Sequence, residues 1–245
     1  MKAKLAVLLS LLTLLPLTAC GSHETTITVL AASSLTGTFT QLGQEFDKQH
    51  PGVTVKFAFD SSATLAQQAV GGAPADVLAT ADKTTMASAE SAQAGTPKNF
   101  ATNVAVLATP AGNPAGISSF SDLNSSKVKY VVCVDTAPCG IVAKALLDRN
   151  HITAPPASTE IDVKSVLAKL TEGEADAGIV YTTDAIAAGS SVKHFAIPGS
   201  ASQITTYPIV ALQQSKQSAL AQDFVDLVTG STGQQVLAKA GFGKP

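Results

Sequence analysis

The sequence predicts an α/β protein in which mostly parallel strands alternate with helices, and three observations support this fold class. Short runs of β-branched and apolar residues recur along the chain, beginning at residues 27–30. Apolar residues three and four positions apart follow several of these runs, as in amphipathic helices. The chain has 245 residues, of which 45% are hydrophobic and 14% charged, so it can bury one large core or two small ones.

In the N-terminal half, the strand at 27–30 precedes a helix that ends before Pro51-Gly52. One face of this helix carries Leu35, Phe39, Leu42 and Phe46. Further strands are expected at 53–59, 75–80 and 103–108. A short helix opens at Ser61-Ser62, runs through Leu65, Ala66, Ala69 and Val70, and closes at Gly71-Gly72.

In the C-terminal half, strands are expected at 128–134 and 177–181. One helix begins near Cys139, with Ile141, Val142, Ala145 and Leu146 facing inward. A second helix begins at Asp162 and carries Val166, Leu167 and Leu170.

The first 19 residues are expected to be a secretory signal peptide. Lys2 and Lys4 precede an apolar run at 5–17, which is too short for a transmembrane anchor across about 30 Å of hydrocarbon. The sequence LTAC at 17–20 resembles a bacterial lipobox, in which Cys20 is lipidated and becomes the mature N-terminus. We therefore expect a tether at 20–25 and an extracytoplasmic protein that is attached to the cell membrane by lipid.

The two remaining cysteines, Cys133 and Cys139, are expected to form a disulfide because they would reside in an oxidising compartment. A redox-active pair is the alternative, but five residues separate them, whereas a thioredoxin motif has two. The structural bridge is favoured.

Composition and motifs argue against two other function classes. The net charge is −2 and Arg149 is the only arginine, so the basic face of a nucleic-acid-binding protein is absent. No His-containing catalytic arrangement, G-x-S-x-G sequence or His/Cys cluster at metal-ligand spacing occurs, which disfavours an extracytoplasmic enzyme or a metal site. No cofactor is expected.

Several polar or backbone donors fall where expected strands meet helices. Helix starts expose N–H groups and partial positive charge, so they favour anions. The positions concerned are Ser34, Ser62, Cys139, the Asp162-Val163 step and Tyr181. Each also has a simpler interpretation, since serine is a common N-cap and a tyrosine at a strand end is often core. On this basis alone the sequence indicates a ligand cleft in a two-lobed protein.

Five segments in order resemble motifs of the molybdate-binding proteins of bacterial ABC transporters. They are AASSL at 31–35, FDSSATLA at 59–66, GAPADVLATAD at 72–82, PCGIVAK at 138–144 and AGIVYTTDA at 177–185, with Asp162-Val163 between the last two. The resemblance extends over residues 26–245. It implies a two-lobed type II periplasmic-binding-protein fold with the ligand in the cleft between the lobes.

The resemblance also implies the binding residues and the partners. Carried over by position, the molybdate or tungstate ligands are Ser34, Ser62, Cys139, Val163 and Tyr181. Lobe 1 would comprise 26–103 and 208–245, and lobe 2 would comprise 104–207, with crossings near Asn103 and Pro208. The expected partner is an ABC transporter permease, and the protein is expected to be a monomer.

One departure and two alternatives accompany this interpretation. The family commonly has alanine where this chain has Cys139, whose backbone N–H we expect to remain a donor. Another tetrahedral oxyanion, such as sulfate or phosphate, would suit the same fold. A solute-sensing lipoprotein is not distinguished from a transport protein by the sequence.

Overall fold

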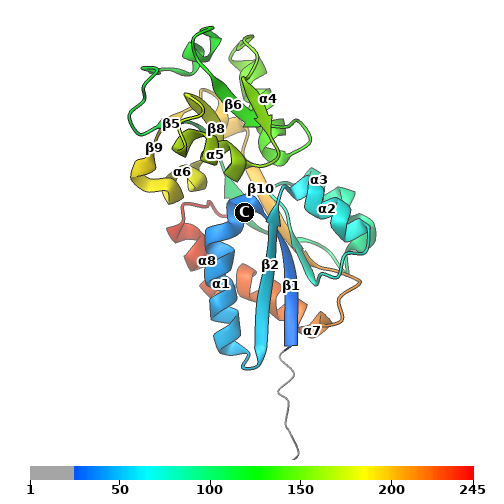
Figure 1. Cartoon of the computed structure of the whole chain (residues 1–245). Helices are drawn as coiled ribbons and strands as arrows, with labels where there is room; N and C mark the ends of the chain where they lie inside the picture. Colours follow the sequence, from blue (N-terminus) through cyan, green and yellow to red (C-terminus); the bar gives the residue numbers. More distant parts are fainter. Residues whose placement is uncertain (1–24) are drawn as a thin grey trace, which may run out of the picture.

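The computed structural model describes residues 25–245, which form two lobes around two five-stranded sheets. Figure 1 shows the lobes stacked end to end, with the C-terminus near their junction. The expected signal peptide and Cys20 lie outside the described residues, as does the expected tether except Thr25, which begins the first strand. Among the residues described, no helix is both long and apolar enough to span a bilayer.

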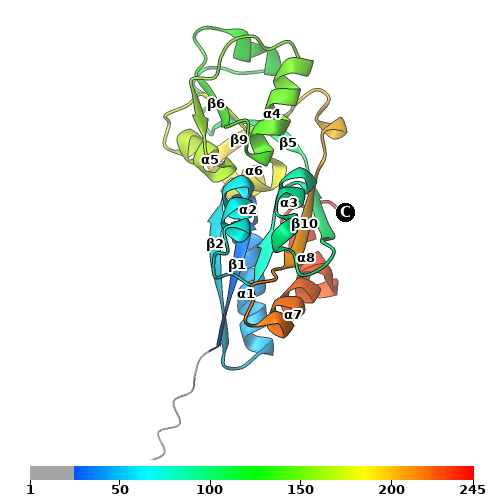
Figure 2. The same ribbon diagram turned by 90° about the vertical axis from the view of Figure 1, so that its right-hand side faces the viewer.

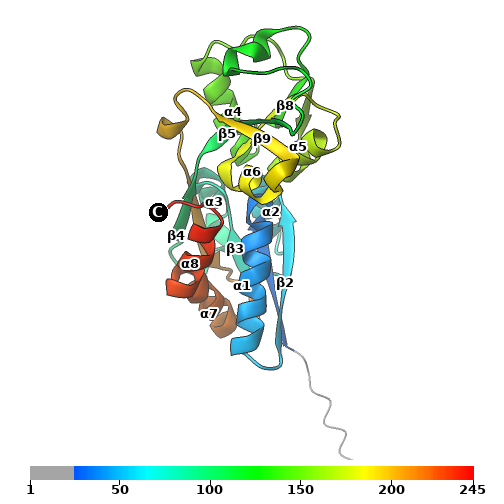
Figure 3. The same ribbon diagram turned by 90° about the vertical axis from the view of Figure 1, so that its left-hand side faces the viewer.

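Lobe 1 has the strand order β2-β1-β3-β10-β4. Its strands are β1 (Thr25–Ala32), β2 (Val53–Asp60), β3 (Val77–Ala79), β4 (Lys98–Asn103) and β10 (Thr205–Ala211). Its helices are α1 (Thr36–Gln49), α2 (Ser62–Val70), α3 (Lys83–Ser88), α7 (Ser218–Thr229) and α8 (Ser231–Lys239), with short 3-10 turns η1 (Ser33–Leu35) and η2 (Glu90–Ala92). Figure 3 shows α1, α7 and α8 on one face of the sheet, and Figure 2 shows α2 and α3 on the other.

The expected helix face is confirmed, because Leu35 at the end of η1 and Phe39, Leu42 and Phe46 in α1 are all fully buried. Phe39 lies at the centre of this core, with ring centroids 5.8 Å from Phe100 and 5.9 Å from Phe224. The expected short helix is α2, in which Leu65, Ala66 and Ala69 are buried and Val70 is 50% exposed. Val70 is the last residue of α2 and lies at the surface.

Lobe 2 has the strand order β7-β6-β8-β5-β9. Its strands are β5 (Ala105–Pro110), β6 (Tyr130–Cys133), β7 (Ser158–Glu160), β8 (Ala177–Tyr181) and β9 (Val192–Ala196). Its helices are α4 (Pro138–Arg149), α5 (Val163–Thr171) and α6 (Thr182–Ala188), with 3-10 turns η3 (Phe120–Asn124), η4 (Gly189–Ser191) and η5 (Ser200–Ser202).

The inward face of α4 differs from the expectation. Ala143 and Leu146 are buried in the lobe 2 core, whereas Ile141 is 45% exposed. Gly140 packs tightly against the backbone just after β6. A Cβ atom added to Gly140 would lie only 1.9 Å from the carbonyl oxygen of Val134, so this side of α4 faces the sheet. The close approach at Gly140 turns Ile141 toward solvent.

Both sheets are mixed, but only one strand in each runs against the other four, so the expectation of mostly parallel sheets is confirmed. In lobe 1, β1 is parallel to β2 and β3, while β10 is antiparallel to β3 and β4. In lobe 2, β6 is parallel to β7 and β8, while β5 is antiparallel to β8 and β9. The strands β5 and β10 each carry the chain in from the other lobe. They enter their sheet at the junction and run away from it, opposite to the strands that end there.

The expected strand at 103–108 is divided between the lobes. Asn103 ends β4 in lobe 1, and Ala105 begins β5 in lobe 2, so the chain crosses at Val104. The return crossing lies between Ala196 and Thr205, since β10 already pairs within lobe 1 from Thr205 onward. This places the return a little before Pro208.

We expect Phe39→Ala to lower the free energy of unfolding by about 3–5 kcal/mol, because it opens a cavity among three other aromatic rings. Urea unfolding followed by circular dichroism measures this change. Gln44→Ala on the exposed face of α1 is the control and is expected to change stability by less than about 0.5 kcal/mol. Equal effects of the two substitutions would contradict the assignment of Phe39 to the core.

Candidate functional site

A single cavity at the junction of the lobes brings together all five residues expected at the ligand site. Its lining from lobe 1 is Ala32, Ser33, Ser34, Asp60, Ser61, Ser62 and Ala81, and from lobe 2 it is Ala137, Pro138, Cys139, Asp162, Val163 and Tyr181. Each of the five expected residues is no more than 7% exposed. Helix α5 of lobe 2 packs against η1 of lobe 1, so the lobes are closed over this cavity.

The two lobe 1 serines follow the ends of neighbouring parallel strands. Ser34 lies in η1 directly after β1, and Ser62 is the first residue of α2 after β2. Neither η1 nor α2 has a side-chain cap, so the interpretation of these serines as plain N-caps is wrong. The Ser62 Oγ instead accepts a hydrogen bond from the Ala81 backbone N–H at 2.9 Å. Because that N–H can only donate, the hydroxyl proton of Ser62 is free to donate elsewhere.

Lobe 2 contributes backbone donors from two helix starts. Cys139 is the second residue of α4, and Val163 is the first residue of α5. The first four N–H groups of a helix have no acceptor within the helix, and they carry its positive dipole end. The cavity is therefore lined on this side by N–H groups suited to an anion.

The expected disulfide is present beside the cavity. Cys133 at the end of β6 is bonded to Cys139 with an S–S distance of 2.05 Å, and their Cα atoms are 5.7 Å apart. The bridge joins both ends of the loop that precedes α4. It holds the Cys139 backbone in place while the sulfur is used for the bridge.

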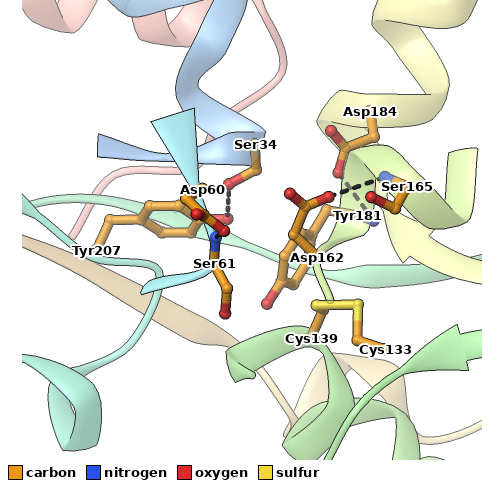
Figure 4. Close-up of a disulfide and its surroundings, with 10 residues drawn as sticks. All are labelled: Ser34, Asp60, Ser61, Cys133, Cys139, Asp162, Ser165, Tyr181, Asp184 and Tyr207. Carbon is orange, nitrogen blue, oxygen red and sulfur yellow. Dashed lines mark hydrogen bonds between the residues drawn. A yellow bond between two sulfur atoms is a disulfide. The ribbon is translucent and has the colours of Figure 1, made fainter. Parts of the chain in front are cut away.

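Tyr181 supplies the most unusual polar group in the site. Its hydroxyl is buried at the end of β8 and has no hydrogen-bond partner among the described residues. The neighbouring Thr205 hydroxyl donates to the carbonyl oxygen of Ala81. Burial raises the pKa of the Tyr181 phenol well above its ordinary value, so the phenol keeps its proton. Figure 4 shows Tyr181 and the disulfide facing Ser34 and Ser61 across the cleft.

Three aspartates and one lysine lie in or beside the cavity, and the lysine forms an ion pair with one of the aspartates. Asp60 accepts the Ser61 N–H at 2.6 Å, and Asp162 caps α5 through the Ser165 N–H at 2.8 Å. The fully buried Asp184 forms an ion pair of 2.8 Å with Lys164. Burial raises the pKa of Asp184, and the Lys164 charge opposes that rise.

Within residues 25–245, no lysine, arginine or histidine lines the cavity, so the donors there are neutral hydroxyl and N–H groups. The described residues also contain no group of three or more His, Cys, Asp or Glu side chains that could hold a metal ion. Hydroxyl and N–H donors arranged in this way suit a ligand that only accepts hydrogen bonds.

Sequence reasoning missed two residues that also line the cavity, Ser33 and Ser61. Both precede a serine that was expected there, and both are nearly buried. The signal that could have found them is the paired serine in each motif, since a tight turn after a strand can point both residues toward the cleft.

We expect Tyr181→Phe to leave the ligand-free protein as stable or to stabilise it, because a buried hydroxyl without a partner costs about 1–3 kcal/mol. Tyr130→Phe is the matched control, since that buried phenol donates to the Ala154 carbonyl and its loss should destabilise. Thermal unfolding of both variants measures the difference. A drop in the melting temperature of Tyr181→Phe as large as that of the control would show that Tyr181 is satisfied in the empty site.

We expect Cys133→Ser/Cys139→Ser to destabilise the protein by roughly 2–2.5 kcal/mol, the chain-entropy gain from closing so short a loop. Chemical unfolding compared with the wild-type protein measures the loss. An unchanged unfolding midpoint would mean that the bridge does not stabilise the loop before α4.

Comparison with known proteins agrees with this geometry. The molybdate-binding protein ModA of Mycobacterium tuberculosis is 41% identical over 243 residues, which covers 94% of this chain and 93% of the relative. The periplasmic molybdate-binding protein of Azotobacter vinelandii superposes with a TM-score of 0.78 at 22% identity, covering 89% of this chain and 99% of that chain. The sulfate-binding protein SubI of Mycobacterium tuberculosis gives a TM-score of 0.70 at 20% identity, covering 89% and 86%.

The last two similarities concern the fold, whereas a family model covers nearly every described residue. Residues 27–243 match the model for bacterial extracellular solute-binding proteins. Two lobes that close over one buried cavity are the architecture such a protein needs to enclose a small solute. This chain therefore belongs to the family of bacterial extracellular solute-binding proteins.

Proposed function

We propose that the protein captures molybdate and tungstate outside the cytoplasm and delivers them to the permease of an ABC importer. The observation that carries this proposal is the buried cavity, whose neutral donors come from both lobes. The 41% identical relative from Mycobacterium tuberculosis is a molybdate-binding protein, which favours this oxyanion over others that the fold accommodates.

A tetrahedral dianion presents only acceptor oxygens, so each of its hydrogen bonds needs a donor from the protein. The proposed donors are the hydroxyl groups of Ser34 and Ser62, the phenol of Tyr181 and the backbone N–H groups of Cys139 and Val163. Hydrogen bonds to a charged group contribute about 1.5–3 kcal/mol each, so a few suffice for tight binding without a cation. Since the Tyr181 hydroxyl has no hydrogen-bond partner within residues 25–245, ligand binding would satisfy it.

Closure of the lobes makes the ligand part of the contact between them. The chain crosses between the lobes at Val104 and again between Ala196 and Thr205, and these two segments are the proposed hinge. With donors on both sides, an oxyanion stabilises the closed form because the open form contacts it from one lobe only. The permease would then recognise the closed form.

The proposal includes membrane attachment and stoichiometry. A lipid on Cys20 would keep the carrier at the cell membrane near the permease, after removal of residues 1–19. The carrier would act as a monomer, since one chain supplies both walls of the cavity.

Isothermal titration of residues 25–245 with molybdate, tungstate, sulfate and phosphate tests the proposal. We expect one-to-one binding of molybdate and tungstate and no heat from the other two anions. Ser62→Ala should weaken molybdate binding by about 10- to 100-fold, the loss of one charge-assisted hydrogen bond. Ser200→Ala, at a buried serine that does not line the cavity, is the control and should bind as the wild type does.

Two outcomes would overturn parts of this proposal. Binding of sulfate or phosphate in place of molybdate would leave an oxyanion carrier but reject the substrate. The absence of measurable binding to any of the four anions would reject oxyanion capture altogether.

A further inference from the structure

Tyr207 lies behind the cavity, where it contacts two site residues, Ser34 through its hydroxyl and Tyr181 through its ring. It is fully buried on β10, and its ring packs edge-on against Tyr181, with centroids 6.2 Å apart. Its hydroxyl lies 3.0 Å from the Ser34 Oγ, as the dashed line in Figure 4 marks. Tyr207 does not line the cavity, so any effect on a bound ligand passes through another residue.

The direction of the Tyr207–Ser34 hydrogen bond follows from Asn103 at the end of β4. The Asn103 Oδ1 accepts the Val104 backbone N–H at 3.0 Å, and this N–H can only donate. The amide orientation is thereby determined, and the Nδ2 faces the other side. The Nδ2 donates to the Thr183 Oγ1 at 2.8 Å and, over a longer distance of 3.4 Å, to the Tyr207 hydroxyl oxygen.

Because Asn103 donates to the Tyr207 oxygen, the proton of the Tyr207 hydroxyl is available for Ser34. Either hydroxyl of the Ser34–Tyr207 pair could donate, but the Tyr207 oxygen already accepts from Asn103, which favours Tyr207 as the donor to the Ser34 Oγ. Burial raises the pKa of Tyr207, and the phenol therefore keeps that proton. The Ser34 oxygen then acts as acceptor toward Tyr207, and the Ser34 proton is directed into the cavity.

We propose that Tyr207, held by Asn103, is a positioning residue that makes Ser34 a hydrogen-bond donor toward the bound oxyanion. This inference rests on the proposed function and deepens it. At Ser62 the Ala81 backbone N–H occupies the hydroxyl oxygen directly, which leaves the Ser62 proton for the ligand. At Ser34 the side chains of Tyr207 and Asn103 have this role. Without Tyr207, the Ser34 hydroxyl is free to rotate and loses part of its binding free energy to that freedom.

We call the hydrogen bonds from Asn103 through Tyr207 to Ser34 the relay, and this relay is linked to both lobes. Thr183 belongs to α6 of lobe 2, whereas Tyr207 and Ser34 belong to lobe 1, and Asn103 stands at the crossing between them. The contact of Thr183 with Asn103 helps to hold the amide that points at Tyr207. The orientation of Ser34 is thus linked to the position of lobe 2.

A double-mutant cycle tests this role through the affinity of the protein for molybdate. We expect Tyr207→Phe to weaken binding about tenfold, corresponding to one hydrogen bond. In a Ser34→Ala background the same substitution should have no further effect, because Phe keeps the ring against Tyr181 and the hydroxyl that Tyr207 orients is already gone. Tyr130→Phe, which removes another buried phenol far from the cleft in lobe 2, should leave the affinity unchanged.

Thr183→Val provides a second variant should Tyr207→Phe unfold. It removes the oxygen that holds Asn103, and it should weaken binding about threefold in the wild-type background and not at all in Ser34→Ala. Thermal unfolding confirms that each variant is folded at the titration temperature.

The outcomes separate this inference from the proposed function. If the wild type binds molybdate and Tyr207→Phe binds equally well, the relay is rejected and the carrier function stands. An equal loss from Tyr207→Phe with and without the Ser34 hydroxyl would show a packing role and would also reject the relay. A wild type that binds none of the four oxyanions rejects both.

Discussion

The oxyanion proposed for the closed cavity between the lobes would impose one constraint on the hydroxyl and N–H groups around it, which is that they present protons and not lone pairs. The protein meets this constraint with donors whose other hydrogen bonds are already assigned. Ala81 occupies the oxygen of Ser62, and Tyr207 occupies the oxygen of Ser34. The Tyr181 phenol has no hydrogen-bond partner in the described part of the chain, so an oxyanion in the closed cavity would satisfy this donor.

The mixed sheets follow from the same arrangement. Strands β1, β2 and β8 end at the cleft, which is why the turns and helices after them can present donors to it. The chain must also pass from one lobe to the other, and β5 and β10 do this by running away from the cleft. One of these crossing strands carries Tyr207, so a strand that joins the lobes also contacts Ser34, the proposed ligand donor. Hinge and site are therefore physically continuous.

Much of the fold and most of the site could be predicted because they depend on local pattern. The spacing of Leu35, Phe39, Leu42 and Phe46 identifies the buried face of α1, since helical geometry places such residues on one side. Local pattern misplaced Ile141, whose exposure depends on how closely Gly140 approaches the Val134 carbonyl. It also favoured N-capping for Ser34 and Ser62, because the chain near a serine does not show which distant group will bond to it.

The sequence by itself determined the alternation of strands and helices, the order of the motifs and the types of donor at the site. These depend on residues within a few positions of one another, where backbone geometry limits the outcomes. Only the tertiary structure decided the mixed direction of the sheets and the chain of contacts from Thr183 through Asn103 and Tyr207 to Ser34. Ser34 and Tyr207 are 173 positions apart, and their contact exists because two crossings return β10 to the first sheet. Hydrogen-bond direction is set by such distant partners, and no local pattern contains them.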